Sequence, residues 1–249
     1  MKKVSIIILE TNELQLDKCL SHIKKQSMSD EIERIILNNR TGRFSSAAEG
    51  LNYGARIAKG DILIFMHQDF YIEDNDAILK YYTYLIKNSN AIIGPAGVNK
   101  NGLPITDISE TEARIRRGVR ANGKVMEVYS LDECMFAMSK CRWEMLGFDE
   151  TTCNNWHCYA VDICYQNLIY GGINVLYPID ACHASTGNAN TKEFRASIKK
   201  MLVKYYKIPQ INKLKGTCID IPCRYTSYYL WIFKCHIKNI LAFFLRKNK

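Results

Sequence analysis

Short apolar strands alternate with helical segments over the first 70 residues, and this alternation limits the fold more than any other feature. Residues 4–9 form a continuous run rich in β-branched side chains, which is typical of a strand buried on both faces of a sheet. Residues 32–37 and 61–66 have the character of two further strands. Between the strands, residues 14–26 have near-helical apolar spacing, and residues 47–58 are rich in small side chains that favour a closely packed helix. The alternation predicts an α/β fold in which a mostly parallel central sheet is flanked by helices on both faces.

The pattern is less regular after residue 70. We expect helices over residues 76–87 and 160–170, and strands over residues 91–94, 125–130, 135–139 and 174–177. Residues 99–125 are polar and contain four arginines, which is typical of a mobile loop or an active-site lid. From residue 191 onward the chain is expected to be mostly helical, with a break near residues 216–222.

Composition places the chain among folded globular proteins, because 47% of its 249 residues are apolar and 24% are charged. The longest unbroken apolar runs have six residues, too few to span a bilayer, and the N-terminus lacks a signal-peptide pattern. We therefore expect a cytoplasmic protein. The ten cysteines include no C-x-x-C pair, so we expect reduced thiols rather than disulfides or metal ligands.

Positive charge is concentrated at the C-terminal end. Residues 192–249 carry a net charge of +12, whereas residues 1–191 carry −3. Residues 225–249 also contain several aromatic side chains, and Tyr229, Phe233 and Phe244 follow helical spacing. A basic aromatic helix of this kind is typical of an in-plane anchor on an anionic membrane surface. The alternatives are a helix docked on the rest of the chain or in a homodimer interface; nucleic acid fits less well, because no recognised binding module accompanies the charge.

The clearest local motif is His67-Gln68-Asp69, which directly follows the apolar strand expected over residues 61–66. In an open parallel sheet, ligands collect at the carboxyl ends of the strands. A carboxylate at that position can hold a hard divalent cation, which in turn neutralises a diphosphate. The alternative is an ordinary exit from a strand into a polar loop.

Two further polar clusters follow in the second half of the chain. His157 and Asp162 lie five residues apart near the start of a predicted helix, and either can act as a general base toward a substrate hydroxyl. In the alternative reading, Asp162 caps the helix and His157 is a hydrogen-bonded structural residue. His183 follows the strand expected over residues 174–177 and can bind a metal through its neutral imidazole, although a lone histidine more often packs locally.

Several well-known site motifs are absent from the sequence. No G-x-G-x-x-G follows the first strand and no P-loop occurs, which argues against Rossmann dehydrogenases and P-loop enzymes. No serine or cysteine lies in a G-x-S-x-G turn, so a nucleophilic triad is poorly supported.

Taken together and in order, these clusters resemble those of bacterial family 2 glycosyltransferases with the GT-A fold, in a branch that has H-Q-D in place of D-x-D. The stretches that carry the resemblance are residues 4–8, 50–56, 58–61, 67–69, 131–134, 147–150, 156–162 and 183–185. The resemblance covers residues 4–205, which predicts a GT-A domain over residues 1–205 and a basic, aromatic, helical extension over residues 206–249.

The resemblance implies a role for each matching position. Asp69 and His183 would bind Mn²⁺ or Mg²⁺, and Asp132, Glu133 and Trp156 would lie close to the sugar or the acceptor. The residues that would contact the nucleotide donor are Glu10, Thr11, Asn12, Asn38, Asn39, Asn52, Arg56, His67 and Gln68. At Asn38 or Asn39, relatives often have an aspartate, so this contact would lack charge here.

The catalytic base departs from the commoner pattern of the family. Many relatives have Glu-Asp shortly before the position of Asp162, where this chain has Tyr159 and Ala160. The base is then expected to be Asp162 or His157, and we favour Asp162. A carboxylate suits an inverting displacement, in which the acceptor hydroxyl attacks as the nucleotide diphosphate leaves.

The predicted function is therefore metal-dependent transfer of a sugar, expected to come from a UDP-sugar, to a lipid-linked glycan in surface polysaccharide synthesis. The enzyme would act at the inner face of the cell membrane. Two other classes remain open. A non-catalytic sugar-binding module is motivated by the missing Glu-Asp pair, and a zinc hydrolase would use His67, His157 and His183 but lacks the short ligand spacings of such sites.

Overall fold

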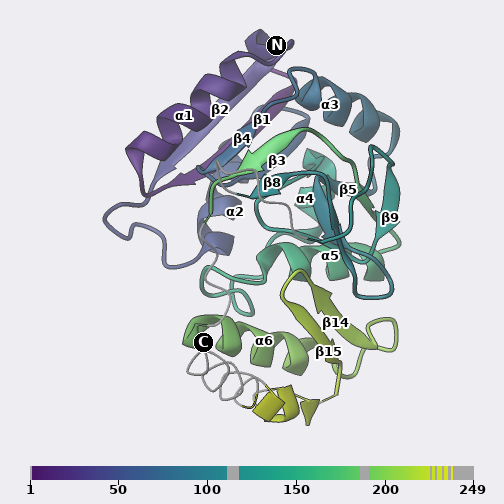
Figure 1. The fold of residues 1–249 in the computed structure, drawn as a ribbon. Helices are drawn as coiled ribbons and strands as arrows, with labels where there is room; N and C mark the ends of the chain where they lie inside the picture. Colours follow the sequence, from purple (N-terminus) through teal and green to yellow (C-terminus); the bar gives the residue numbers. More distant parts are fainter. Residues whose placement is uncertain are drawn as a thin grey trace, which may run out of the picture.

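The structure is a computed structural model that describes residues 2–110, 118–185 and 191–224, together with eight residues between 226 and 237. A seven-stranded sheet crosses its centre in the order β2-β1-β3-β11-β5-β12-β9 (Figure 1). Its strands are β1 Val4–Glu10, β2 Ile32–Asn38, β3 Ile62–Met66, β5 Ala91–Gly94, β9 Met126–Val128, β11 Met135–Ser139 and β12 Ile173–Leu176. Only β11 and β9 run against the other strands, so the predicted mostly parallel α/β sheet is confirmed.

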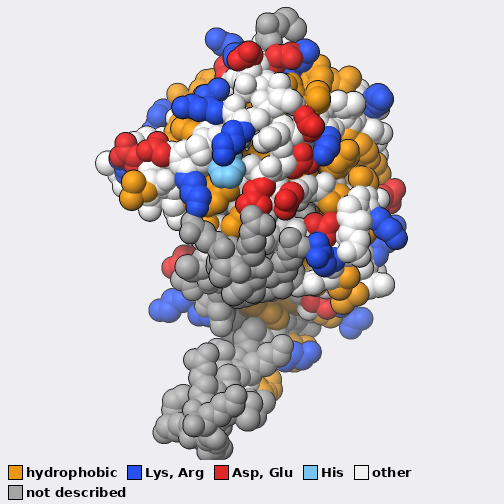
Figure 2. Space-filling view, turned by 45° about the horizontal axis from the view of Figure 1, so that its top comes forward, with side chains coloured by type: hydrophobic (Ala, Val, Ile, Leu, Met, Phe, Trp, Pro, Cys, Tyr) orange, Lys and Arg blue, Asp and Glu red, His pale blue; other side chains and the backbone are white. Residues whose placement is uncertain are grey.

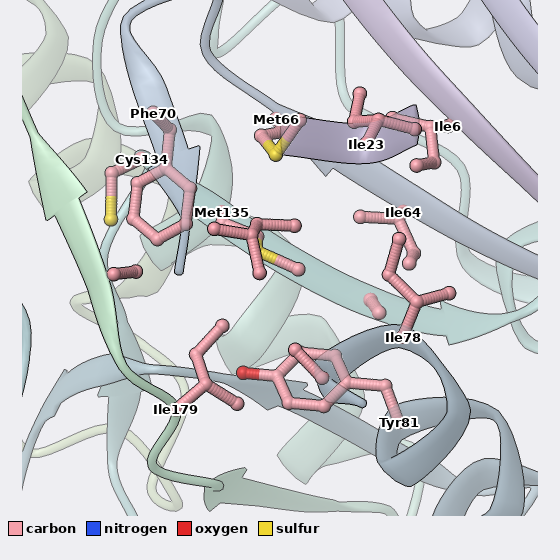
Figure 3. Packing of buried hydrophobic residues seen from close by; sticks show 14 of the residues in the cluster. Ile6, Ile23, Ile64, Met66, Phe70, Ile78, Tyr81, Cys134, Met135 and Ile179 are labelled. Carbon is pink, nitrogen blue, oxygen red and sulfur yellow. The ribbon is translucent and has the colours of Figure 1, made fainter. Parts of the chain in front are cut away.

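Helices cover both faces of the sheet because its strands are buried on both sides. On β1, Ile6 and Ile8 pack with α1 (Glu13–Lys24) and α3 (Ala77–Lys87) on one face. Ile7 packs on the other face with α2 (Ala47–Ile57), α4 (Lys140–Leu146) and α5 (Tyr159–Ile169). Figure 3 shows the first of these cores, where Ile23 of α1 and Ile78 and Tyr81 of α3 lie against the sheet.

Helix α2 packs unusually close to the sheet, as its small residues predict. A Cβ atom at Gly50 would lie 2.5 Å from Leu9 Cδ2, and one at Gly54 would lie 2.5 Å from Ile7 Cγ2. Both neighbours are side chains of strand β1. The helix begins at Ser46, whose side chain accepts a hydrogen bond from the backbone N–H of Glu49.

Several short strands were not predicted. Strands β4 (Phe70–Ile72), β13 (Ala181–His183) and β8 (Ser109–Glu110) form one small sheet, and β10 (Ser130–Leu131), β6 (Ala96–Val98) and β7 (Pro104–Thr106) form another. A single 3₁₀ turn, η1 (Ser29–Glu31), precedes β2. The region over residues 99–125, expected to be a loop, therefore contains β7 and β8, and its residues 111–117 lie outside the described part.

The C-terminal part differs from the predicted all-helical extension. Helix α6 (Lys192–Tyr205) is followed by a β-hairpin, β14 (Lys213–Gly216) and β15 (Ile219–Pro222), where only a break between helices was expected. Helix α6 and the hairpin share an apolar core with α5. Both lie at the lower end of the molecule in Figure 1. Most of the predicted membrane helix over residues 225–249 lies outside the described residues. Within the described part, no helix is long and apolar enough to cross a membrane.

Candidate active site

Two adjoining hollows open at the carboxyl ends of β1 and β3, each with a volume of about 250 Å³. The first hollow is lined by residues of β1, α2 and β3 and of the loop that follows β3, among them Leu9, Thr11, Leu51 and Gln68. The second is lined by residues of α5, α6 and the hairpin tip. His67, Glu133 and Trp156 line both, so the two hollows form one cleft at the edge of the sheet where α/β proteins bind ligands.

His67, Asp69 and His183 come together at the floor of this cleft. One ligand atom of each residue lies within 4.8 Å of the ligand atoms of the other two. His67 and Asp69 follow β3 directly, and His183 reaches them because β13 pairs with β4 and places His183 opposite Phe70. The backbone N–H of Ala184 also donates to the Asp69 carbonyl, at 2.9 Å. A short sheet that the sequence did not reveal therefore assembles the predicted metal ligands.

The charges within this group suit a divalent cation. Asp69 Oδ1 lies 3.4 Å from His183 Nε2 and 3.9 Å from His67 Nδ1. Burial and the charge of His183 lower the pKa of His67, whereas the Asp69 carboxylate outweighs burial and raises the pKa of His183. His183 Nε2 is buried and lacks a well-directed hydrogen bond. Two imidazoles and a carboxylate fit Mn²⁺ better than Mg²⁺, which prefers oxygen ligands.

Tyr159, the first residue of α5, holds one nitrogen of His67. Its hydroxyl lies 2.8 Å from His67 Nε2 and 3.5 Å from the carbonyl oxygen of Glu133. A phenol has one proton, so if it is directed to the Glu133 carbonyl, the phenol oxygen accepts the proton of His67 Nε2. His67 Nδ1 then keeps its lone pair and faces Asp69, where a cation would satisfy both groups.

Glu133 lies at the junction of the two hollows. Its Oε1 atom is buried, and burial together with the charge of Asp132 raises the pKa of Glu133 to about 8. Hydrogen bonding from the backbone N–H groups at the start of α5, among them those of Cys158 and Tyr159, opposes this rise. Oε1 has no hydrogen-bond partner, so Glu133 is a carboxyl group whose one oxygen is held by a helix N-terminus and whose other is free to meet a ligand.

Asp132 and Trp156 complete the walls of the second hollow. Asp132 accepts hydrogen bonds from the backbone N–H of Cys134, at 3.0 Å, and from the hydroxyl of Thr217, at 2.7 Å. These bonds and the charge of His183 outweigh burial and lower the pKa of Asp132. Trp156 is 42% exposed, so its indole face is available to a ligand in either hollow.

Comparison of the sequence with known families now decides the class of protein. Residues 5–205 match the glycosyltransferase-like family. The chain belongs to this family. No curated protein sequence matches the chain significantly.

The structure is also similar to the crystal structure of GalNAc-T7 with UDP, GalNAc and Mn²⁺, with a TM-score of 0.60 and 12% identity. The similarity covers 85% of this chain and 49% of that one, so this glycosyltransferase spans about half the length of its structural relative. At such low identity the likeness concerns the fold, and it confirms the predicted GT-A architecture.

The predicted donor residues fall into three groups in the structure. Thr11 and Gln68 line the first hollow, and Gln68 Oε1 accepts hydrogen bonds from the backbone N–H groups of Thr11 and Asn12. Asn12 also begins α1 by accepting from the N–H of Gln15. Gln68 therefore ties the end of β1 to the loop that carries Asp69.

The next three predicted donor residues belong to the loop after β2 and its support. Glu10 is 2% exposed and pairs with Arg40, at 2.7 Å. Asn38 accepts a hydrogen bond from the N–H of Arg40, and the buried Asn39 accepts from the N–H of Phe44. These side chains shape the loop beside the first hollow, and none of the three is among the residues that line it.

Asn52 and Arg56 of helix α2 are not brought into the cleft. Asn52 is buried and bonds the carbonyl of Phe148, the carboxylate of Glu150 and the indole N–H of Trp143. It therefore holds the loop after α4 against α2. Arg56 is exposed on the last turn of α2 and lines neither hollow. The contacts of Asn52 are with structural residues, and a role of the two residues in donor binding stays a prediction.

The structure places Asp162, the favoured candidate for the base, outside the lining of both hollows. Asp162 is 1% exposed, and Lys204 lies 2.8 Å from its Oδ1. The hydroxyl of Tyr205 donates to Oδ1 at 2.7 Å, and the amide of Gln166 donates to Oδ2 at 2.8 Å. A carboxylate with every lone pair engaged, and absent from the lining of both hollows, is not placed to take a proton from a substrate.

His157, the other candidate base, lines the second hollow at its rim. Its ring packs edge-on against Phe194 and lies 3.5 Å from the hydroxyl of Thr191. Burial lowers the pKa of His157. It does not join His67 and His183 in the metal-binding group found among the described residues, so the three-histidine zinc site of the alternative hypothesis is not formed.

Glu133 and Tyr159 lie closer to the centre of the cleft than the sequence motifs indicated. Glu133 was expected near the sugar or acceptor only by resemblance, and Tyr159 was noted only because it cannot replace a carboxylate. The available signal was the pair of acids Asp132 and Glu133 directly after a short apolar stretch, which places carboxylates at a strand end.

Proposed function

We propose that this glycosyltransferase transfers a sugar from a nucleotide diphosphate donor, a UDP-sugar, to a hydroxyl group of a glycan acceptor. The observation that carries the proposal is the position of the buried, unpartnered Glu133 in the same cleft as His67, Asp69 and His183. The two hollows then hold the two substrates: the nucleotide lies in the first, beside Thr11 and Gln68, and the acceptor lies in the second.

A divalent cation, Mn²⁺ or Mg²⁺, would be held by His67, Asp69 and His183. When bound, it supplies positive charge that neutralises the leaving diphosphate. The residues that line the cleft explain why a cation is needed. Among the described residues that line the two hollows, none is a lysine or an arginine. The relative crystallised with UDP and Mn²⁺ supports the same combination of ligands.

Glu133 is the base of the proposed reaction. The acceptor hydroxyl gives its proton to Glu133 Oε1, and its oxygen forms a bond to the anomeric carbon. The bond from that carbon to the diphosphate oxygen breaks, and its electron pair stays on the diphosphate. A single carboxylate on the acceptor side suits a one-step, inverting displacement. With a pKa of about 8, the ionised fraction of Glu133 that can accept a proton grows as the pH rises toward 8.

We further propose that the acceptor is a lipid-linked glycan of a surface polysaccharide and that the enzyme works at the inner face of the membrane. The support is the +12 charge of residues 192–249. On the face drawn in Figure 2, basic and acidic side chains of the described residues are interspersed, so no large basic area of that face competes with the C-terminal segment.

The proposal is tested by donor hydrolysis in a panel of UDP-sugars with Mn²⁺, Mg²⁺ or chelator. One UDP-sugar is expected to release UDP slowly, with metal and not with chelator. Asp69→Asn should abolish this release, because it removes the negative ligand of the cation. Asp76→Asn, an exposed aspartate at the start of α3, is the matched control and should leave the rate unchanged. Release of UDP by Asp69→Asn in chelator would overturn the metal-dependent mechanism.

A further inference from the structure

The tip of the β14–β15 hairpin forms one wall of the cleft. Residues 216–219, which include Thr217 and Cys218, line the second hollow together with Trp156 and Phe194. The hairpin lies beyond residue 205, where the match to the glycosyltransferase-like family ends. A segment outside the shared family sequence therefore faces the shared catalytic group.

The hairpin is fixed firmly in this position. Leu214, Ile219 and Ile221 are almost completely buried in the core that α5 and α6 also form. The hydroxyl of Ser130 donates to the Lys215 carbonyl at 2.5 Å, and that of Tyr165 donates to the same carbonyl at 3.0 Å. At the tip, Thr217 donates to Asp132, which precedes Glu133 in the chain. This bond fixes the tip of the hairpin beside Asp132 and therefore close to the proposed base.

The chemistry of the second hollow favours a neutral sugar. It offers the exposed face of Trp156, the edge of Phe194 and the carboxylates of Asp132 and Glu133. Aromatic faces pack on the apolar faces of sugar rings, and carboxylates accept hydrogen bonds from sugar hydroxyls. No lysine or arginine lines this hollow among the described residues, so a phosphate group is a poor fit there.

We propose that the hairpin tip and Trp156 together form the acceptor subsite, which binds the terminal neutral sugar of the acceptor glycan. The inference rests on the proposed function, because it assigns the second hollow to the acceptor. It adds that a segment beyond the matched family sequence selects the acceptor, whereas the matched sequence builds the donor and metal half.

Cys218 provides a direct probe of occupancy. It is an exposed thiol that lines the second hollow. Cys141 of α4 is also exposed and serves as the matched reference. It lies two residues after Ser139, which pairs with the first residue of β3. Cys141 is therefore at the opposite end of β3 from the cleft. Alkylation of both thiols by N-ethylmaleimide is followed in one sample by peptide mass spectrometry, and the ratio of the two rates is compared with and without ligand.

The ligands to use are p-nitrophenyl glycosides of common hexoses and N-acetylhexosamines, each with UDP and Mn²⁺ present. A glycoside at ten times its Kd should slow alkylation of Cys218 by about tenfold and leave Cys141 unchanged, because only unoccupied protein reacts. If no glycoside changes the ratio, or if both thiols slow equally, the inference is overturned. Donor hydrolysis on the same protein separates the two hypotheses: hydrolysis without protection refutes only the subsite, and protection without hydrolysis refutes only the proposed function.

A pair of variants tests the same inference by transfer. Cys218→Trp fills the second hollow and should abolish transfer to the glycoside that protects, while UDP binding with Mn²⁺ is retained. Cys141→Trp makes the same change at the opposite edge and should leave transfer and binding unchanged. Wild-type transfer by Cys218→Trp would overturn the inference.

Discussion

Two groups of buried charge meet near the start of helix α5, and they differ in how their atoms are satisfied. In the first, which we call the cleft group, are His67, Asp69, Glu133 and His183. In the second, which we call the α6 group, Lys204 of α6 lies 2.8 Å from both Asp149 and Asp162. Both groups contain carboxylates removed from water, so burial alone does not distinguish them.

Their hydrogen bonds distinguish them. Each carboxylate oxygen of Asp149 and Asp162 has partners, which include Lys204, Tyr205 and the backbone N–H of Thr152. In the cleft group, Glu133 Oε1 and His183 Nε2 have no hydrogen bond, although His183 Nε2 lies 3.4 Å from Asp69 Oδ1, and they are two of the three such buried side-chain atoms in the described part of the chain. A fully paired group holds α6 against the body of the protein, whereas unpartnered buried atoms mark the place that a ligand occupies.

The largest effect is expected when one carboxylate is removed from each group. Glu133→Gln keeps the shape of the side chain but cannot accept a proton, so transfer should fall by about 10²–10⁴-fold. Binding of UDP with Mn²⁺ should be nearly unchanged, because the metal ligands remain. Both are measured on purified protein, transfer by release of UDP and binding by calorimetry.

Asp162→Asn is the partner variant for this test. It should lower the melting temperature and leave the rate per folded molecule close to that of the wild type, because Asp162 contacts Lys204 and Tyr205 rather than the cleft. A folded Asp162→Asn protein without transfer activity, beside an active Glu133→Gln, would return the role of base to Asp162.

The second prediction concerns the stability that the α6 group provides. Lys204→Met leaves Asp162 buried without its cation, which should lower the free energy of unfolding by about 3 kcal/mol, the low end for a broken buried pair. Lys204 is 24% exposed, so water can partly replace it. Urea denaturation monitored by circular dichroism measures the change.

Lys200→Met is the matched control, one turn earlier on α6. Its ammonium group donates only to the carbonyl of Thr151, at 3.0 Å and on the surface. It should change the free energy of unfolding by less than about 0.5 kcal/mol. Equal losses for both variants would show that the α6 group has no special part in stability.

The main sheet could be predicted because its strands are long and buried on both faces. The runs at β1 and β3 have no competing helical pattern, and the glycines of α2 correctly indicate close packing. Strands β8 and β13 have two and three residues, too few for any alternation to be visible. The hairpin was missed because its strands are short and lie in a basic stretch that resembles the helices around it.

The metal ligands could be predicted from the H-Q-D motif and its order relative to His183, whereas the roles of the two acids could not. Glu133 and Asp162 are both acidic residues in stretches that carry the family resemblance, and the sequence around them does not tell their roles apart. The difference is Lys204, which is 42 residues beyond Asp162 in the chain and reaches it only after α6 packs on α5. Partners that depend on long-range packing leave no local pattern in a sequence.

The third prediction examines how the cleft group is prepared for a cation. Tyr159→Phe keeps the ring, which packs near Phe136 and Phe148, but removes the hydroxyl that holds His67 Nε2. Removing such an outer partner of a metal ligand typically weakens binding by about tenfold or more. The affinity for Mn²⁺ alone, without nucleotide, is measured by electron paramagnetic resonance of the free ion.

Tyr165→Phe provides the comparison for this variant. It also removes a phenol hydroxyl from α5, but that hydroxyl contacts Lys215 of the hairpin rather than the cleft. Its Mn²⁺ affinity should equal that of the wild type, while its stability falls. Equal Mn²⁺ affinity for Tyr159→Phe and the wild type would show that His67 is oriented without the tyrosine.

The last prediction concerns a difference in pH dependence between the two groups in metal-free protein. The folded state raises the pKa of Glu133 from 4.5 to about 8, so the folded protein holds a proton that the unfolded chain releases in this range. The stability that this proton provides is fully present below pH 4.5 and is lost as the pH rises toward 8. Glu133→Gln imitates the protonated form, so its stability relative to the wild type should grow by up to about 1.4 kcal/mol per pH unit across this window.

Asp149 of the α6 group should show the opposite sign. Burial would raise its pKa, but Lys204 and Thr152 outweigh burial and lower it below the ordinary value of 3.8. Its contribution is therefore present above pH 3.8 and is lost as the pH falls further.

Urea denaturation of wild type, Glu133→Gln and Asp149→Asn at a series of pH values gives the two profiles. The difference in free energy of unfolding between Glu133→Gln and the wild type should grow above pH 4.5. The difference between the wild type and Asp149→Asn should disappear below pH 3.8. If the difference in free energy of unfolding between Glu133→Gln and the wild type does not change with pH, Glu133 is ionised and already paired in the folded protein, which would remove the distinction between the two groups.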